Sequence, residues 1–126
     1  NYYKQEFGSP LLRKLVCFER LVSLENICEI KKTSNAIEEK TSVAGRRTVN
    51  IDPGYITEAK VVLLTTKDYS HRIYIGSRIF AECTLYFNDG AFKPWPWTYP
   101  DYASKEIVDF FCRAREKYRQ DARGRE

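Results

Sequence analysis

The residues best suited to chemistry lie between positions 52 and 82. This stretch holds the only histidine of the chain, His71, with Asp68 shortly before it and Glu82 after it. A histidine beside carboxylates can act as a general acid or base, and such a set can also hold a divalent ion that activates water. We therefore name His71, Asp68 and Glu82 as the candidate catalytic residues. The alternative is that His71 only caps the start of a strand and bonds a neighbouring carbonyl group.

Cations in the same stretch indicate an anion site. Lys60, Lys67 and Arg72 follow Asp52, where the pattern predicts the start of a helix with free amide groups. Such amides and cationic side chains together can hold a phosphate, and Glu82 would orient Arg72. We therefore expect Asp52, Lys60, Lys67 and Arg72 to bind the ligand. The alternative places Lys67 at a helix C-terminus and makes Arg72–Glu82 a cross-strand ion pair worth under about 1 kcal/mol.

The cysteines do not indicate a metal site. Cys17, Cys28, Cys83 and Cys112 form no C-x-x-C motif and no short cluster, so a zinc site is not predicted. We interpret them as reduced core thiols of a cytosolic protein. Cys83 would lie across a hairpin from His71, but its aliphatic neighbours favour a buried and unreactive thiol. The sequence therefore assigns neither a metal nor a cofactor.

Residues 94–102, which we call the strap, are rich in proline and aromatic residues and offer a different function. Trp95, Trp97, Tyr99 and Tyr102 could stack on bases or contact a protein partner. Such a segment can also pack over its own sheet. The strap therefore keeps open the alternative of a non-catalytic interaction module.

The net charge does not indicate a nucleic-acid surface. Residues 113–126 carry six Lys or Arg and three Asp or Glu, so this tail accounts for +3 of the net charge of +4. The rest of the chain is nearly neutral, which argues against nucleic acid as a partner of the folded body. No apolar run approaches the roughly 20 residues that span a bilayer, so we expect a soluble, cytoplasmic protein.

Periodicity predicts the elements that must position these residues. Apolar residues recur at helical spacing over residues 24–40 and 105–120, each just after a serine suited to cap a helix. β-branched and aromatic residues predict strands over residues 13–22 and 46–51. Asp52 and the proline after it favour a helix that continues to Lys67, although the β-branched run within 57–67 also fits a buried strand.

A β-hairpin follows, and the side-chain pattern indicates its register. Aliphatic residues alternate with polar or aromatic ones on both sides of a turn. A two-residue turn would mix the two faces, whereas a three-residue turn over 76–78 keeps the aliphatic face intact. The register with the three-residue turn places Arg72 opposite Glu82 and Ile75 opposite Ile79.

Several blocks together resemble a known family. They are, in order, GSPLLRKLVCFERL, RRTVNIDPGYIT, AKVVLLTTKDYSHRIYIG, IFAECTLYF and PWTYPDY. This combination resembles the bacterial and archaeal family called domain of unknown function 4416, over about residues 2–118. The resemblance implies a further N-terminal strand–helix–strand segment that is missing here, in agreement with the absence of methionine from the chain. The resemblance implies no agreed activity. Some members carry a "GTP-binding" label, but this chain contains no G-x-x-x-x-G-K-[ST] motif that would support it.

We therefore expect a single α+β domain over residues 1–126, lacking an N-terminal segment. A mainly antiparallel sheet of about four strands would carry two or three helices on one face. The preferred function is binding of a small anionic ligand, such as a nucleotide, at a polar site around residues 52–82, with catalysis undecided. The alternative is the interaction module that uses the strap.

Overall fold

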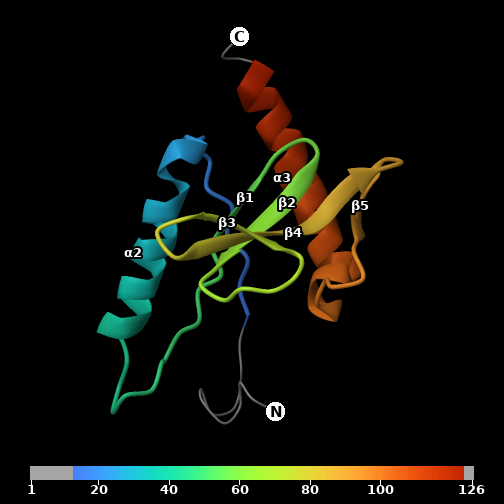
Figure 1. Cartoon of the computed structure of the whole chain (residues 1–126). Coiled ribbons are helices and arrows are strands. Elements are labelled where there is room, and N and C mark those ends of the chain that lie inside the picture. The colour runs from blue at the N-terminus through green and yellow to red at the C-terminus, as the bar shows by residue number, and fades with distance from the viewer. Residues whose placement is uncertain (1–12, 124–126) are drawn as a thin grey trace.

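The computed structural model describes residues 13–123 and shows one sheet with a long helix on either side (Figure 1). The 3-10 helices are η1 (Leu24–Asn26) and η2 (Pro100–Ala103), and the α-helices are α2 (Ile27–Lys40) and α3 (Lys105–Arg123). The strands are β1 (Gly54–Ile56), β2 (Lys60–Thr65), β3 (Arg72–Gly76), β4 (Ile79–Asn88) and β5 (Ala91–Pro94). No helix of this described part is long and apolar enough to cross a membrane.

Strand β4 is the centre of the five-stranded antiparallel sheet, whose main order is β1-β2-β4-β3. On one side it pairs with β2 through most of its length. On its other side β3 pairs with residues 79–82, and β5 pairs with residues 85–88. On this edge the backbone of Cys83 and Thr84 therefore lies between the ends of β3 and β5, and no further strand among residues 13–123 pairs with it there.

The two α-helices pack on opposite faces of the sheet. The cluster under α2 is formed by Ile27, Leu64 and Ile79. The cluster under α3 is formed by Val61, Leu85 and Phe92. Tyr55 packs against the first cluster and Ile56 against the second. Because neighbouring residues of a strand point to opposite faces, the sheet lies between the helices, with α2 on the left and α3 on the right in Figure 1.

The α+β class and the mainly antiparallel sheet are confirmed, with five strands instead of about four. The prediction that the helices share one face of the sheet is wrong, because the two helices bury separate clusters. The helices expected over 24–40 and 105–120 are confirmed, apart from the 3-10 turn that begins the first. Their serine caps are confirmed too, since Ser23 Oγ accepts from Glu25 N and Ser104 Oγ from Ile107 N.

The helix favoured over residues 52–67 is wrong, and the alternative strand is correct. The chain forms β1, a short turn and β2 there. A strand covered by helices on both faces is apolar throughout instead of alternating. Val61, Val62 and Leu64 are accordingly all buried. This continuous apolar run resembles a buried helix in the sequence.

The strands expected over 13–22 and 46–51 are also wrong. Neither segment is a strand in the structure, because none of the strands found within residues 13–123 pairs with its backbone. Residues 46–51 are held by side chains instead: Glu38 Oε2 accepts from Ile51 N at 2.7 Å, and Thr48 Oγ1 donates to Thr41 O at 2.8 Å.

The hairpin prediction is confirmed in its register and wrong in its turn. Arg72 pairs with Glu82, as the unbroken aliphatic face requires. The turn, however, contains only Ser77 and Arg78, and Gly76 instead of Ile75 pairs with Ile79. A bulge between Tyr74 and Gly76 absorbs the extra residue. A short turn and an intact aliphatic face are therefore compatible.

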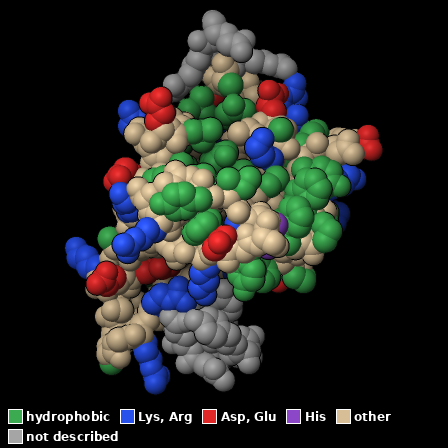
Figure 2. Space-filling model, in the orientation of Figure 1, with side chains coloured by type: hydrophobic (Ala, Val, Ile, Leu, Met, Phe, Trp, Pro, Cys, Tyr) green, Lys and Arg blue, Asp and Glu red, His purple; other side chains and the backbone are tan. Residues whose placement is uncertain are grey.

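Several large apolar side chains remain on the surface. Figure 2 shows hydrophobic side chains across the middle of the face on which β3 lies in Figure 1. Strand β3 itself exposes Ile73, Tyr74 and Ile75. In the segment before η1, Val16, Phe18 and Val22 are exposed as well.

Candidate functional site

The candidate site begins at the interval between β3 and β5, where the strap returns over β4. Trp97 Nε1 donates to Cys83 O at 2.8 Å, and Thr98 Oγ1 donates to Thr84 O at 2.6 Å. These two carbonyl groups lie where no strand of the described part of the chain pairs with that edge of β4. Buried backbone groups need partners, so the strap side chains take the place of the absent strand. This arrangement brings the strap against the end of β3.

Glu82 lies at the centre of the polar cluster beside the strap. Its Oε1 lies 2.7 Å from His71 Nε2 and 3.0 Å from Arg72 Nε, and Thr84 Oγ1 donates to its Oε2. The residue is only 5% exposed, and the side chains of His71 and Arg72 are largely covered. A buried carboxylate needs such partners to offset its lost hydration. The three residues therefore hold one another in place.

The contact with Glu82 determines which nitrogen of His71 is protonated. An ionised carboxylate can only accept hydrogen bonds, so Nε2 must carry the proton that lies between it and Glu82 Oε1. In the neutral ring this leaves Nδ1 with a free lone pair. A histidine oriented in this way by a carboxylate can accept a proton from a bound molecule. The geometry is thus suited to acid–base work.

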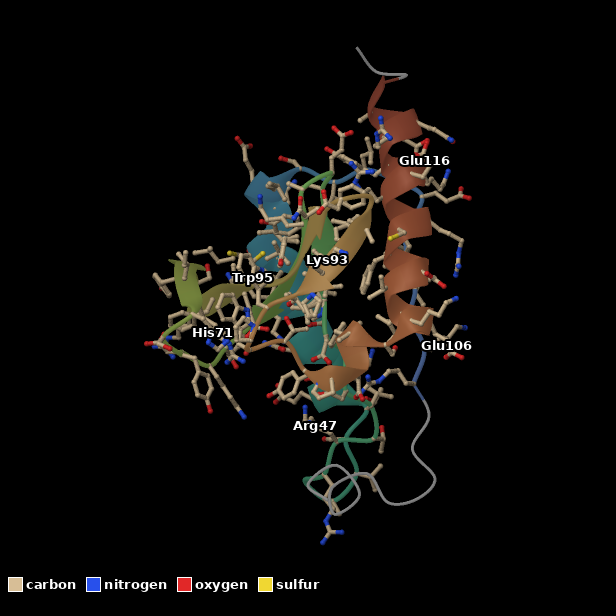
Figure 3. The ribbon with its side chains drawn as sticks, turned by 90° about the vertical axis from the view of Figure 1, so that its right-hand side faces the viewer. Arg47, His71, Lys93, Trp95, Glu106 and Glu116 are labelled. Carbon is tan, nitrogen blue, oxygen red and sulfur yellow. The ribbon has the colours of Figure 1, made fainter. Side chains whose placement is uncertain are left out.

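Aromatic rings surround the histidine and extend away from it. The ring of His71 stacks on Trp97 with centroids 5.0 Å apart, and Trp97 stacks on Trp95 at 5.1 Å. The His71 ring also stacks on the Tyr69 ring, with centroids 6.0 Å apart. The Arg72 guanidinium lies 4.6 Å from the centre of the same Tyr69 ring. His71 and Trp95 are labelled in Figure 3, near the β3 end of the sheet. The stacked rings and Glu82 together fix the plane of the imidazole.

These groups line an open pocket of about 230 Å³. It is lined by Tyr69, His71, Arg72, Glu82, Trp97 and Tyr99. Three of the six were named from the sequence as site residues, and the rings come from the strap and from the loop before β3. The polar site and the aromatic strap, which the sequence presented as rival functions, therefore form one pocket.

The other predicted site residues do not line this pocket. Lys67 contributes its backbone, because its carbonyl oxygen accepts from Arg72 Nη1 at 3.1 Å, while Asp68 is exposed in the following loop. Lys60 pairs with Tyr86 in the ladder between β2 and β4. Of the seven named residues, the pocket gathers only His71, Arg72 and Glu82.

Asp52 lies in a different part of the molecule. Its carboxylate accepts from Asn50 Nδ2 at 3.2 Å, and Asn50 in turn accepts from Arg47. Figure 3 shows Arg47 in the loop after α2, well apart from His71. Because residues 52–56 do not begin a helix, the helix-start amides expected there to receive an anion are not present.

Metal binding and thiol catalysis gain no support from the arrangement. Within residues 13–123, no three His, Cys, Asp or Glu side chains are grouped closely enough to hold a metal ion. Cys83 Sγ accepts from Trp95 Nε1 at 3.4 Å and donates to Leu85 O at 3.7 Å. The thiol is thus engaged with the strap and with β4. As expected of core thiols, Cys28 and Cys112 pack against the two core clusters, whereas Cys17 is exposed.

Sequence reasoning missed that Tyr69, Trp97 and Tyr99 belong to the site. A signal was present, since a buried indole N–H seeks an acceptor and proline excludes much of the strap from a central strand. The periodicity of the chain does not show where the strap returns to the sheet. That position depends on the interval between β3 and β5, which is a tertiary feature.

Comparison with known proteins identifies one family. The family model described as "Domain of unknown function (DUF4416)" matches residues 1–118. No curated protein and no solved structure matches the chain. The family description names no reaction, so function has to be argued from the site itself.

Proposed function

The chain belongs to the DUF4416 family, and from its own geometry we propose that it binds a small anionic ligand carrying a planar ring. The site is the pocket between the start of β3 and the strap. One observation supports this most: Arg72, Glu82 and His71 converge with the aromatic rings of the strap in one open pocket of about 230 Å³. This volume is below the range of pockets that take drug-sized molecules, so it suits a single ring with one acidic substituent.

Arg72 supplies the positive charge for the anion. Its Nε bonds Glu82 and its Nη1 bonds Lys67 O. A guanidinium has further N–H donors, and those left over can take a carboxylate or phosphate with two parallel bonds. The two contacts hold the side chain in position before the ligand arrives, which lowers the entropy cost of binding.

The exposed rings supply the surface for the planar part. Tyr69 and Tyr99 line the pocket and are each more than half exposed. Trp97 forms a wall, because its ring already stacks on both His71 and Trp95. A base, nicotinate or benzoate ring could stack on the tyrosines with its acidic substituent on Arg72. A nucleotide is one member of this ligand class.

A thermal-shift panel tests the proposal. The panel contains nucleoside monophosphates, aromatic carboxylates and inorganic phosphate, added to wild type, Arg72→Lys and Arg78→Lys. Lysine keeps the charge but loses the planar fork, so Arg72→Lys should weaken binding, while Arg78, exposed in the hairpin turn, serves as the matched control. At 100 times its Kd, a ligand stabilises the folded chain by about 2.7 kcal/mol. The proposal fails if no compound raises Tm, or if both variants respond as wild type does.

A second candidate is acid–base catalysis on the same ligand. The 2.7 Å contact between His71 Nε2 and Glu82 Oε1 favours it, because it orients the ring for proton transfer at Nδ1. His71→Gln would then abolish turnover of a ligand found by the panel while leaving its affinity nearly unchanged. If His71→Gln weakens binding without affecting any reaction, the histidine serves binding alone.

The strap is less suited to the alternative of an interaction module. Both of its tryptophans are half-buried, and their N–H groups bond Cys83. A docking surface would need these rings to be available to a partner. A cytoplasmic location remains part of the proposal, and it agrees with four cysteines that are free of disulfide bonds.

A further inference from the structure

Two polar atoms of the pocket remain open to a ligand. Arg72 uses Nε on Glu82 Oε1 and Nη1 on Lys67 O, which leaves Nη2. His71 uses Nε2 on the same oxygen of Glu82, which leaves Nδ1. Within residues 13–123 neither Nη2 nor Nδ1 has a hydrogen bond, and neither is a buried atom left without a partner. Both atoms are therefore accessible, on two residues that line the open pocket.

These two atoms are opposite in kind. Nη2 of a guanidinium carries N–H groups and no lone pair, so it can only donate. Nδ1 of an imidazole that is protonated at Nε2 carries a lone pair, so it can only accept. A ligand that satisfies both must offer a negatively charged acceptor to Arg72 and an N–H or O–H donor to His71.

The acceptor and the donor have to be neighbours on that ligand. His71 Nε2 lies 2.7 Å and Arg72 Nε lies 3.0 Å from the same atom, Glu82 Oε1, so the imidazole and the guanidinium lie side by side. The Tyr69 ring contacts both, with its centre 6.0 Å from that of His71 and 4.6 Å from the Arg72 guanidinium. Adjacent positions of one small ring are therefore what reaches both groups.

Charge alone gives this pocket little selectivity. Glu82 lies against Arg72 and offsets its positive charge, so an anion gains less from Arg72 than it would from an unpaired guanidinium. A directed hydrogen bond to Nδ1 adds what charge does not supply. A site with an acceptor in a fixed position rejects molecules that cannot donate to it, because that acceptor is then left unpaired.

We infer that the pocket selects planar ring acids that carry an N–H or O–H group next to the acid group. This inference rests on the proposed function and names the ligand class of the same site. Pyrrole-2-carboxylate is a simple probe, since its carboxylate can bond Arg72 Nη2 while its ring N–H donates to His71 Nδ1. Furan-2-carboxylate has nearly the same shape but places a ring oxygen there, so two lone pairs would face each other.

Isothermal titration calorimetry with the two acids tests the inference. Wild type should bind pyrrole-2-carboxylate about 10-fold or more tightly than furan-2-carboxylate. His71→Phe keeps a ring to stack on Tyr69 and Trp97 but has no acceptor, so it should bind both acids equally. Tyr74→Phe is the matched control, because it removes a polar atom from β3 outside the pocket and should keep the preference. Equal affinities in wild type overturn the inference, as does a preference that His71→Phe leaves unchanged.

Nitrogen-15 NMR of the imidazole gives a second readout that depends on no variant. His71 is the only histidine of the chain, so its two ring nitrogens are observed without competing signals. Pyrrole-2-carboxylate should move the Nδ1 signal toward that of a hydrogen-bonded nitrogen and leave the proton on Nε2, whereas furan-2-carboxylate should not move it. A proton found on Nδ1 of the free chain, or equal responses to the two acids, would refute the assignment.

The same titrations separate this inference from the proposed function. If compounds of the thermal-shift panel bind through Arg72 but the two ring acids show no difference, only the ligand class is wrong. If neither ring acid nor any panel compound binds, the proposed function fails together with it.

Discussion

Arg72 and Glu82 lie directly opposite each other in the β3–β4 ladder, with Arg72 Nε 3.0 Å from Glu82 Oε1. Their side chains are only 10% and 6% exposed. An exposed cross-strand pair contributes under about 1 kcal/mol, because water solvates both charges whether or not they meet. A covered pair is different, since each charge has lost its hydration and depends on its partner. The pair is therefore a condition for the fold of the hairpin as well as part of the pocket.

Removing the carboxylate of Glu82 should be strongly destabilising. Glu82→Ala leaves a covered guanidinium without its counter-charge and should lower the free energy of unfolding by about 3–5 kcal/mol. Urea denaturation measures the difference. Glu39→Ala, on the exposed side of α2, is the control and should change stability by less than about 0.5 kcal/mol. If both substitutions cost the same, Arg72 and Glu82 do not depend on each other as argued.

The turn of the β3–β4 hairpin should accept a stabilising replacement. Ser77 and Arg78 have φ values of +53° and +63°, the left-handed conformation that side chains disfavour. A two-residue turn with both central φ values positive prefers Asn-Gly. The double change Ser77→Asn and Arg78→Gly should therefore stabilise the chain by about 1 kcal/mol in urea denaturation. Arg78→Ala keeps the strain and is the control; a gain as large as that of the double change would contradict this account.

Gly54 is required by the close approach of β1 to β2. A Cβ at this position would lie 2.1 Å from Val62 O, a backbone atom held in the ladder. Gly54→Ala should therefore separate the strands and cost about 3 kcal/mol or more. Gly90→Ala is the comparison, because Gly90 has space around it and only a positive φ of +79°. Equal losses of Tm in the two variants would mean that β1 shifts freely.

The hairpin could be predicted because its side chains alternate, and a slip of one residue would expose the aliphatic face. That register alone brought Arg72 to Glu82. His71 followed as their neighbour, so the centre of the site could be predicted from local pattern. Lys60 and Lys67 were expected to join it from one helix. Once residues 60–65 form a strand instead, nothing directs the two lysines to the same place.

The rest of the site depends on contacts between residues far apart in the sequence, and such contacts produce no periodic pattern. Trp97 enters the pocket because its N–H reaches Cys83 O between the ends of β3 and β5. Neither the interval nor the path of the strap follows from composition or spacing. The apolar run in β2 was interpreted as part of a helix because its sequence pattern was ambiguous. Burial by helices on both faces removed the alternation by which strands are recognised.

The pH dependence of stability should report on Tyr55 at high pH. Burial, and to a lesser extent the charge of Cys83, raises the pKa of Tyr55 above its ordinary value of 10.0. The folded chain then holds the phenolic proton more tightly than the unfolded chain does. This contribution is complete below the ordinary pKa and is lost as the pH rises toward the folded value.

The unfolding free energy of wild type should therefore fall between about pH 9 and pH 11 more steeply than that of Tyr55→Phe. Phenylalanine keeps the ring packed against the core cluster of Ile27, Leu64 and Ile79 but has no proton to lose. Urea denaturation at a series of pH values measures both slopes. Tyr99→Phe, at an exposed tyrosine, is the control and should keep the wild-type slope. Parallel curves for wild type and Tyr55→Phe would mean that Tyr55 ionises as easily in the folded chain as in the unfolded one.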